Sequence, residues 1–292
     1  MENNKVAVVG AGLMGNGIAQ ACATAGYEVV NIDTFEAAIE KAQTTVEKLF
    51  SRKVAKGSMT EEKKAEILER LTYSSDLTDV KDSFLVVEAV PENIDIKKDT
   101  FKKIDELADP ETVIVSNTSG LSISEIASVT NRPDKVMGAH FFYPAPVMKL
   151  LELVRGLATS DKTYETVREF AGKIGKTTVD APEFPGFMVN RILVPMQNEA
   201  AFMVMEGSSP EDVDNAMKLG CNHPMGPIEL TDFVGIDTML ATMTGLYKGF
   251  HDSKYRPCPL LETMVKSGML GKKSGQGFYK YDEKGNKIGS NF

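Results

Sequence analysis

The chain has 292 residues, of which 42% are hydrophobic and 25% charged, and its formal net charge is -8. This length favours two domains over one, and the negative charge argues against a nucleic-acid binder, which needs a basic face. No apolar run approaches the ~20 residues that span a bilayer. The N-terminus has no signal-peptide layout, so no membrane association and a cytoplasmic location are expected. The three cysteines form no C-x-x-C pair, which indicates neither a disulfide framework nor a metal site.

Strand-like and helix-like segments alternate from residue 5 to about residue 180, which predicts an α/β domain with a parallel sheet over residues 1–183. Runs such as F-L-V-V and V-I-V are typical of strands buried on both faces. The expected strands are Lys5–Val9, Glu28–Ile32, Phe84–Glu88, Val113–Ser116, Lys135–His140 and Leu150–Val154. Helices are expected over Leu13–Ala25, Thr44–Lys56 and Thr60–Thr72.

The character of the sequence changes after V179-D-A-P-E-F-P-G186, and residues 184–292 are predicted to form an all-helical domain. The segment Phe187–Glu206 is apolar on more than one face, so it must be covered by the first domain or by a second copy of the chain. A further helix should begin at Pro210, with Ser209 as its N-cap. The tail that ends at Tyr281 reads as a loop followed by a short aromatic strand.

A glycine-rich turn, G10-A-G-L-M-G15, joins the first expected strand to the first expected helix. In this context the G-x-G-x-x-G spacing predicts a dinucleotide site, with the pyrophosphate on the N-terminus of the helix. Asp33, 18 residues after Gly15, ends the second strand, where a carboxylate would bind the adenine ribose hydroxyls and favour NAD over NADP. The expected cofactor-binding residues of this motif are Gly10, Gly12, Leu13, Met14, Gly15 and Asp33.

Two ionisable residues, His140 and Glu152, stand in otherwise apolar segments on either side of a turn, P144-A-P-V. Because they are equidistant from Pro146, a hairpin would bring the imidazole and the carboxylate face to face. Such a pair suits a general base, since the carboxylate fixes the imidazole tautomer and stabilises the imidazolium. The alternative is a core histidine and a charge at a strand edge.

Motifs along nearly the whole chain resemble the L-3-hydroxyacyl-CoA dehydrogenases. They are G10-A-G-L-M-G-N-G-I-A19, V86-V-E-A-V-P-E-N93, S116-N-T-S119, G138-A-H-F-F-Y-P-A-P-V-M-K-L-L-E152, P185-G-F-M-V-N-R191, H223-P-M-G-P-I-E-L230 and G271-K-K-S-G-Q-G-F-Y-K280. The resemblance implies a Rossmann-like domain, a helical C-terminal domain through which two subunits pair, and NAD(H)-linked conversion of (S)-3-hydroxyacyl-CoA to 3-oxoacyl-CoA. A four-carbon substrate, 3-hydroxybutyryl-CoA, is expected.

The resemblance also implies roles for single residues. His140 would be the catalytic base and Glu152 its partner, while Ser119 and Asn190 would hold the substrate oxygen and orient the reacting groups. Cofactor contacts would come from Ser119 and from Glu92, Lys97 and Lys273. From the residues alone, Ser119 could serve only to stabilise a turn, and Lys97 could be a solvated helix residue.

One residue departs from the family pattern. Tyr143 stands where the family usually has an asparagine that helps to place the nicotinamide end of the cofactor. Its hydroxyl could reach the same region, or the ring could simply pack against its neighbours.

Coenzyme A is an anion, so a chain of this net charge needs a local group of cations. Arg52 and Lys56, four residues apart on one expected helix face, are the candidates, and an ordinary solvated helix face is the alternative. Two other functions are open: a dehydrogenase of free 3-hydroxy acids, and an NAD-binding sensor without turnover. The segment P185-G-F-M-V-N-R191 lacks the lysine that the first of these would use.

Overall fold

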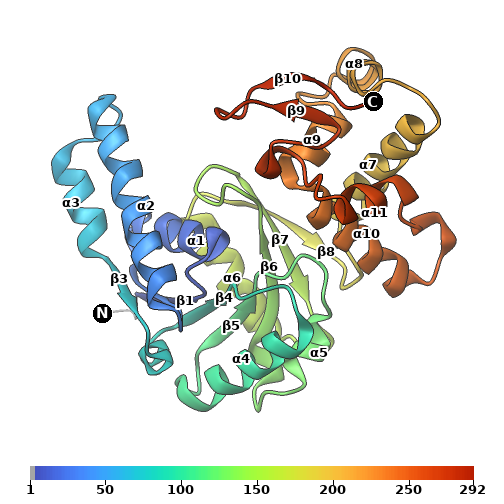
Figure 1. The fold of residues 1–292 in the computed structure, drawn as a ribbon. Coiled ribbons are helices and arrows are strands. Elements are labelled where there is room, and N and C mark those ends of the chain that lie inside the picture. Colours follow the sequence, from blue (N-terminus) through green and yellow to red (C-terminus); the bar gives the residue numbers. More distant parts are fainter. Residues whose placement is uncertain (1–3) are drawn as a thin grey trace. The chain divides into compact units, whose positions relative to one another are not determined.

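A computed structural model describes residues 4–292, and the chain divides after Glu183 into two units (Figure 1). The first unit contains one eight-stranded sheet with the strand order β3-β2-β1-β4-β5-β6-β7-β8. Its strands are β1 (Lys5–Val9), β2 (Glu28–Ile32), β3 (Leu71–Ser74), β4 (Leu85–Glu88), β5 (Val113–Ser116), β6 (Val136–Phe141), β7 (Leu150–Arg155) and β8 (Thr177–Ala181). All neighbours pair in parallel except β6 and β7. The order 3-2-1-4-5-6 is that of a Rossmann fold, so the predicted α/β architecture is confirmed.

Six helices accompany this sheet in the described part of the first unit: α1 (Leu13–Thr24), α2 (Glu36–Ala55), α3 (Glu61–Glu69), α4 (Ile94–Leu107), α5 (Ile123–Ala127) and α6 (Asp161–Lys173). Short 3-10 turns lie at Leu77–Val80 and Pro133–Lys135. Strands β4 and β5 are buried along their whole length, as their unbroken apolar runs predict. One core cluster of this unit forms where the strands meet residues of α1, α2 and α6, such as Ile18, Phe50 and Phe170.

Four elements differ from the predictions. Strands β3 and β8 were missed; both are edge strands that pair on one side only, and their partial exposure leaves no continuous apolar run in the sequence. Helix α2 begins at Glu36 rather than Thr44. Helix α3 begins where predicted, with Thr60 as its N-cap accepting a hydrogen bond from Lys63 N, but it ends at Glu69 because Leu71–Ser74 pairs with β2.

The second unit, Phe184–Phe292, contains α7 (Val189–Met205), α8 (Pro210–Cys221), α9 (Pro227–Val234), α10 (Ile236–Phe250) and α11 (Pro259–Lys266). It is mainly helical, as predicted, but not all-helical, because β9 (Tyr279–Tyr281) and β10 (Lys287–Ser290) form an antiparallel pair. Two 3-10 turns, Ser253–Tyr255 and Lys272–Ser274, complete it. Ser209 caps α8 by accepting a hydrogen bond from Asp212 N. No helix within residues 4–292 is both long and apolar enough to cross a membrane.

Two buried aspartates attach the β9–β10 pair to the helices of the second unit. Asp232 of α9 accepts hydrogen bonds from the backbone N–H groups of Phe278 and Tyr279, at 2.9 and 2.8 Å. Asp214 of α8 accepts one from the Tyr279 hydroxyl at 2.7 Å. Burial raises the pKa of Asp232 to about 6, although its hydrogen bonds oppose that rise. The pair is therefore held by side chains that the apolar pattern of the helices does not reveal.

Helix α1 approaches β1 so closely that one position has no room for a side chain. A Cβ on Gly15 would lie 1.9 Å from the carbonyl oxygen of Gly10 and 3.3 Å from the Ala89 Cβ. Gly10 itself has φ +110°, a conformation that other residues rarely adopt. The start of α1 is thus fixed directly against the end of β1.

We expect Gly15→Ala to lower the free energy of unfolding by about 1–3 kcal/mol or more, because the added methyl must displace backbone. Gly172→Ala is the matched control, since a Cβ there meets nothing within 4 Å and alanine favours a helix. Thermal unfolding followed by circular dichroism would compare the two variants with the unmodified chain. Equal midpoints for Gly15→Ala and the unmodified chain would contradict the close approach.

Candidate functional site

The chemistry-bearing residues of the first unit gather where its parallel strands end. Val9 of β1 is paired with Ile32 and with Glu88, and Ser116 of β5 is paired with Glu88 and with Gly138. The segments that follow these strands therefore meet at one edge of the sheet. In open α/β sheets, ligands bind at this carboxyl edge.

The N-terminus of α1 is suited to an anionic group. Gly12 is its N-cap, and among the described residues no side chain caps this helix and no acid lies in its first turn. A Cβ placed on Gly12 would meet nothing within 4 Å, so the backbone there is open to an approaching ligand. Helix N-termini offer N–H groups and a positive dipole end to phosphate. This geometry fits a dinucleotide pyrophosphate.

Asp33 follows β2 directly and supports the glycine turn. Its Oδ2 accepts a hydrogen bond from Ala11 N at 2.8 Å, and its Oδ1 accepts one from Phe35 N at 3.0 Å. The sequence interpretation assigned this carboxylate to a ribose, and its place beside the turn is consistent with that assignment. The contact to Ala11 was not foreseen.

His140 and Glu152 form a buried pair. They are directly opposite each other in the antiparallel ladder of β6 and β7, and His140 Nδ1 lies 2.7 Å from Glu152 Oε2. The glutamate is fully buried and the histidine is 5% exposed. The ring of Phe142 packs against the imidazole, with 4.5 Å between ring centroids. The hairpin inferred from spacing is thus present in the structure, and the predicted contact forms.

Lys176 ties down the loop between these two strands. Its Nζ donates hydrogen bonds to the carbonyl oxygens of Ala145 and Met148, the latter at 2.7 Å. The loop also lies near α1, because a Cβ on Gly17 would be 3.4 Å from the Ala145 Cβ. Burial lowers the pKa of Lys176. The loop that joins β6 to β7 is therefore fixed at several points.

Lys97 is buried in an ion pair and is not the solvated helix residue of the alternative interpretation. It lies on α4 with Phe101 and Ile104, at the four- and seven-residue spacing of a core-facing stripe. Its Nζ is 2.6 Å from Glu88 Oε1 and 3.4 Å from Glu92 Oε2. Because an ammonium buried to 1% exposure needs a counter-charge, the pair with Glu88 explains how this position tolerates lysine.

Glu92 connects this ion pair to Ser119. Its Oε1 accepts hydrogen bonds from the Thr118 hydroxyl at 2.6 Å and from Ser119 N at 2.8 Å. Asn117, in the same segment, accepts a hydrogen bond from Phe141 N at 2.8 Å, one residue after His140. The segment that carries Ser119 is therefore attached both to Glu92 and to the strand of the histidine.

The other predicted site residues include Asn190, Lys273 and Tyr143. Asn190, in the first turn of α7, and Lys273 belong to the second unit. Lys273 forms an ion pair there, with its Nζ 2.7 Å from Asp237 Oδ2. Tyr143 is half exposed in the loop after β6. The cofactor and substrate roles predicted for Asn190, Lys273 and Tyr143 remain predictions.

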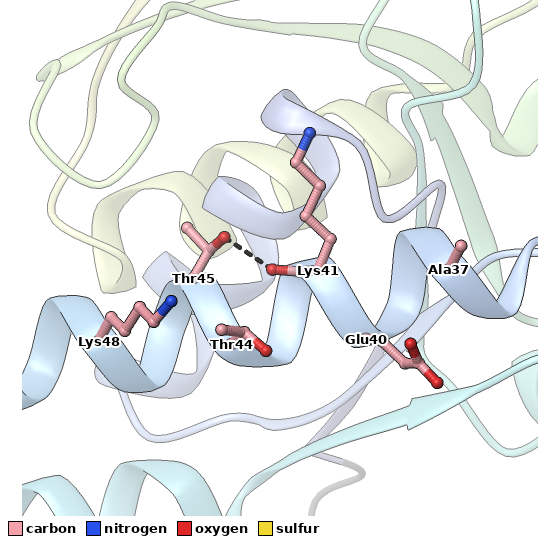
Figure 2. A pocket seen from close by; sticks show the side chains of 6 residues that line it. All are labelled: Ala37, Glu40, Lys41, Thr44, Thr45 and Lys48. Atoms are coloured by element: carbon pink, nitrogen blue, oxygen red, sulfur yellow. Dashed lines mark hydrogen bonds between the residues drawn. The ribbon is translucent and has the colours of Figure 1, made fainter.

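Arg52 and Lys56 are exposed at the C-terminal end of α2, where positive charge also stabilises the helix dipole. Two other lysines line an open recess of about 410 Å³ along the same helix (Figure 2). Its lining residues are Ala37, Glu40, Lys41, Thr44, Thr45 and Lys48. Arg52 and Lys56 thus lie on the same helix as this recess, which is nearer the start of the helix, and their role in substrate binding remains a prediction.

Three residues of this site were missed: Glu88, Asn117 and Lys176. Glu88 ends an apolar strand, and a carboxylate in that position could have been noticed as a buried charge in need of a partner. Asn117 and Lys176 act through contacts 24 to 31 residues away in the sequence, for which no local pattern exists.

Comparison with known proteins gives matches along nearly the whole chain. The family model for the 3-hydroxyacyl-CoA dehydrogenase NAD binding domain matches residues 5–184, and that for the C-terminal domain matches residues 186–281. The chain is 50% identical over 285 residues to a protein of Bacillus subtilis named probable 3-hydroxybutyryl-CoA dehydrogenase, covering 97% of this chain and 99% of the relative. It is 48% identical over 280 residues to the 3-hydroxybutyryl-CoA dehydrogenase of Clostridioides difficile, covering 96% and 100%.

A solved structure agrees in fold as well as sequence. The crystal structure of (S)-3-hydroxybutyryl-CoA dehydrogenase PaaH1 from Ralstonia eutropha matches with a TM-score of 0.93 and 48% identity. The match covers 97% of this chain and 100% of that one.

The buried ion pair predicts unequal effects at two adjacent lysines. Lys97→Met leaves Glu88 buried without its closest cation, so the free energy of unfolding should fall by about 3–5 kcal/mol. Lys98→Met, the control, removes only a partly exposed pair with Glu125 and should cost less than about 1 kcal/mol. Chemical denaturation of both variants measures the difference, and similar losses would argue against the pair.

Proposed function

The chain belongs to the 3-hydroxyacyl-CoA dehydrogenase family, and we propose that it interconverts (S)-3-hydroxybutyryl-CoA and acetoacetyl-CoA with NAD(H). The observation that carries this proposal is the buried contact between His140 and Glu152 at the edge of the sheet where the glycine turn also lies. A proton acceptor and a dinucleotide-binding turn together are what an alcohol dehydrogenase needs. The four-carbon substrate is taken from the names of the close relatives.

The first unit holds NAD(H), as its family model states. When bound, this cofactor accepts or returns a hydride. The N-terminus of α1 would receive the pyrophosphate, and Gly12 gives it room. Asp33 would face the adenine ribose, where a 2′-phosphate would be repelled by the carboxylate. The preference for NAD over NADP follows from that repulsion.

His140 would exchange the proton of the substrate hydroxyl. Because its Nδ1 faces Glu152, the reacting proton would be carried on Nε2. In the oxidation direction, Nε2 would take the proton from the substrate hydroxyl oxygen while the carbon that carries this hydroxyl loses its hydride to NAD+; in reduction, both transfers would reverse. Glu152 would hold the imidazole in one tautomer and stabilise the imidazolium that forms. Phe142, packed on the ring, would limit the access of water.

Ser119 and Asn190 would bind the substrate oxygen, and Glu92 would hold the Ser119 backbone in place. Lys41 and Lys48, in the recess on α2, are candidates for coenzyme A phosphates beside the predicted Arg52 and Lys56. These cations matter because the net charge of the chain is -8, so an anionic substrate needs a local attraction.

Two subunits would pair through the second unit, and the chain would act in the cytoplasm. The support for pairing is the number of large apolar side chains that this unit leaves exposed, including Ile192 at 75% and Leu219 at 86%. The length of α7 and its apolar character agree with the expectation that a second copy covers part of it.

Oxidation of NADH tests the substrate class. The protein should oxidise NADH with acetoacetyl-CoA and show little activity with free acetoacetate, since the coenzyme A part would supply most of the binding. Parallel assays with longer 3-oxoacyl-CoA esters and with NADPH measure chain length and cofactor preference. Faster turnover of free acetoacetate would favour a dehydrogenase of free 3-hydroxy acids, and NADH binding without any turnover would favour a sensor.

The role of His140 is tested by His140→Gln. This change should lower kcat by about 10²–10⁴, the usual contribution of a general base, while the dissociation constant for NADH stays nearly constant. His223→Gln, in the second unit, is the control and should leave kcat unchanged. Stopped-flow turnover and NADH fluorescence titration give the two quantities, and near-normal turnover by His140→Gln would refute the assignment.

A further inference from the structure

We propose that Glu88 is a positioning residue for the dehydrogenase reaction, holding Lys97 so that Glu92 can fix the Ser119 segment. This inference rests on the proposed function, because it concerns how the residues of that site are placed. Glu88 was not among the predicted site residues, and no step of the proposed reaction uses it. It is nevertheless a fully buried carboxylate at the carboxyl edge of the sheet.

Three groups surround the Glu88 carboxylate. Oε1 accepts hydrogen bonds from Lys97 Nζ at 2.6 Å and from Val90 N at 2.7 Å, and Oε2 accepts one from the Ser116 hydroxyl at 2.6 Å. The ammonium and two dipoles thus offset the loss of water around the charge. Glu88 is thereby bonded to both α4 and the end of β5.

These contacts continue into a closed polar ring. Thr118 N donates to the Ser116 hydroxyl oxygen at 3.2 Å, and the Thr118 hydroxyl donates to Glu92 Oε1 at 2.6 Å. The second oxygen of Glu92 lies 3.4 Å from Lys97 Nζ, which returns the ring to Glu88. Ser119 N is attached to this ring through the same Glu92 oxygen that binds Thr118.

Lys97 interacts unequally with the two carboxylates of this polar ring. One ammonium lies between two carboxylates, and it is closer to Glu88, at 2.6 Å, than to Glu92, at 3.4 Å. If Glu88 lost its charge, the attraction between Lys97 and Glu92 would be the one that remained. Glu92, whose side chain is 44% exposed, would then turn toward Lys97 and away from Thr118 and Ser119.

A shift of this segment would reach the histidine strand. Asn117, between Ser116 and Thr118, accepts the hydrogen bond from Phe141 N, next to His140. Catalysis depends steeply on such geometry, since a displacement of about 1 Å can lower a rate by about 10²-fold. The charge of Glu88 would thus act on turnover without touching substrate or cofactor.

The central experiment compares Glu88→Gln, Lys97→Met and the double variant in the acetoacetyl-CoA and NADH assay. Glu88→Gln keeps the shape of the side chain but removes its negative charge, and it should lower kcat by about 10- to 100-fold. If Glu88 acts through Lys97, the double variant should be no slower than Lys97→Met alone, because coupled residues are not additive. Losses that multiply in the double variant, or an unchanged kcat in Glu88→Gln, would overturn the inference.

Asp105→Asn is the matched control for a purely structural effect. Asp105 also lies buried on α4 in an ion pair, 2.6 Å from Arg132 Nε, but it has no contact with the ring. It should lower the thermal midpoint and leave kcat within about twofold. An equal loss of kcat in Asp105→Asn would show that Glu88→Gln acts only by weakening the fold.

A second variant covers the case in which Glu88→Gln does not fold. Thr118→Val keeps the ion pair but removes the hydroxyl, which donates to Glu92 and accepts from Gly120 N and Leu121 N. It should lower kcat by about 10-fold or more, because these contacts hold the Ser119 segment. An unchanged kcat in Thr118→Val would overturn the inference. No turnover by the unmodified chain would instead remove the proposed function, and this inference with it.

Discussion

The antiparallel pairing of β6 with β7 is the constraint on which the site depends. The remaining strand pairs of the sheet are parallel, and only this one reverses the chain within a short loop. Its register sets His140 opposite Glu152, and a slip by one residue would turn one of the two side chains to the other face. The Lys176 contacts to the loop and the packing of the loop near α1 resist such a slip. The buried pair is thus a consequence of the antiparallel pairing of β6 with β7.

The carboxyl edge of the sheet brings the other groups to this pair. Parallel strands end side by side, so the glycine turn after β1, Asp33 after β2, Glu88 at the end of β4 and Ser116 at the end of β5 are neighbours in space though distant in sequence. Side chains then bond one segment to the next, with Asn117 joined to β6 and Asp33 to the glycine turn. Positioning is therefore shared between backbone pairing and a few buried polar contacts.

Much of this arrangement was predictable because it depends on the types and spacing of residues that are close in the sequence. The glycine spacing, the double-sided apolar strands and the symmetric placement of His140 and Glu152 about Pro146 each follow from neighbouring residues. The edge strands β3 and β8 were not predictable, since an edge strand has too little burial to leave a pattern. Lys97 was read from its own residues as a solvated helix residue, because a lysine on a helix gives no sign of burial until its buried partner Glu88 is known.

Asp33 illustrates how one side chain can serve two needs at once. Its carboxylate accepts hydrogen bonds from Ala11 N and Phe35 N, so it supports the glycine turn as well as being the proposed partner of the adenine ribose. Redesign of the cofactor specificity would begin by removing this negative charge. An apolar replacement would leave both N–H groups without their acceptor and loosen the turn at which the pyrophosphate is proposed to bind. A workable redesign would therefore keep an oxygen acceptor at this position and add the cation for a 2′-phosphate elsewhere.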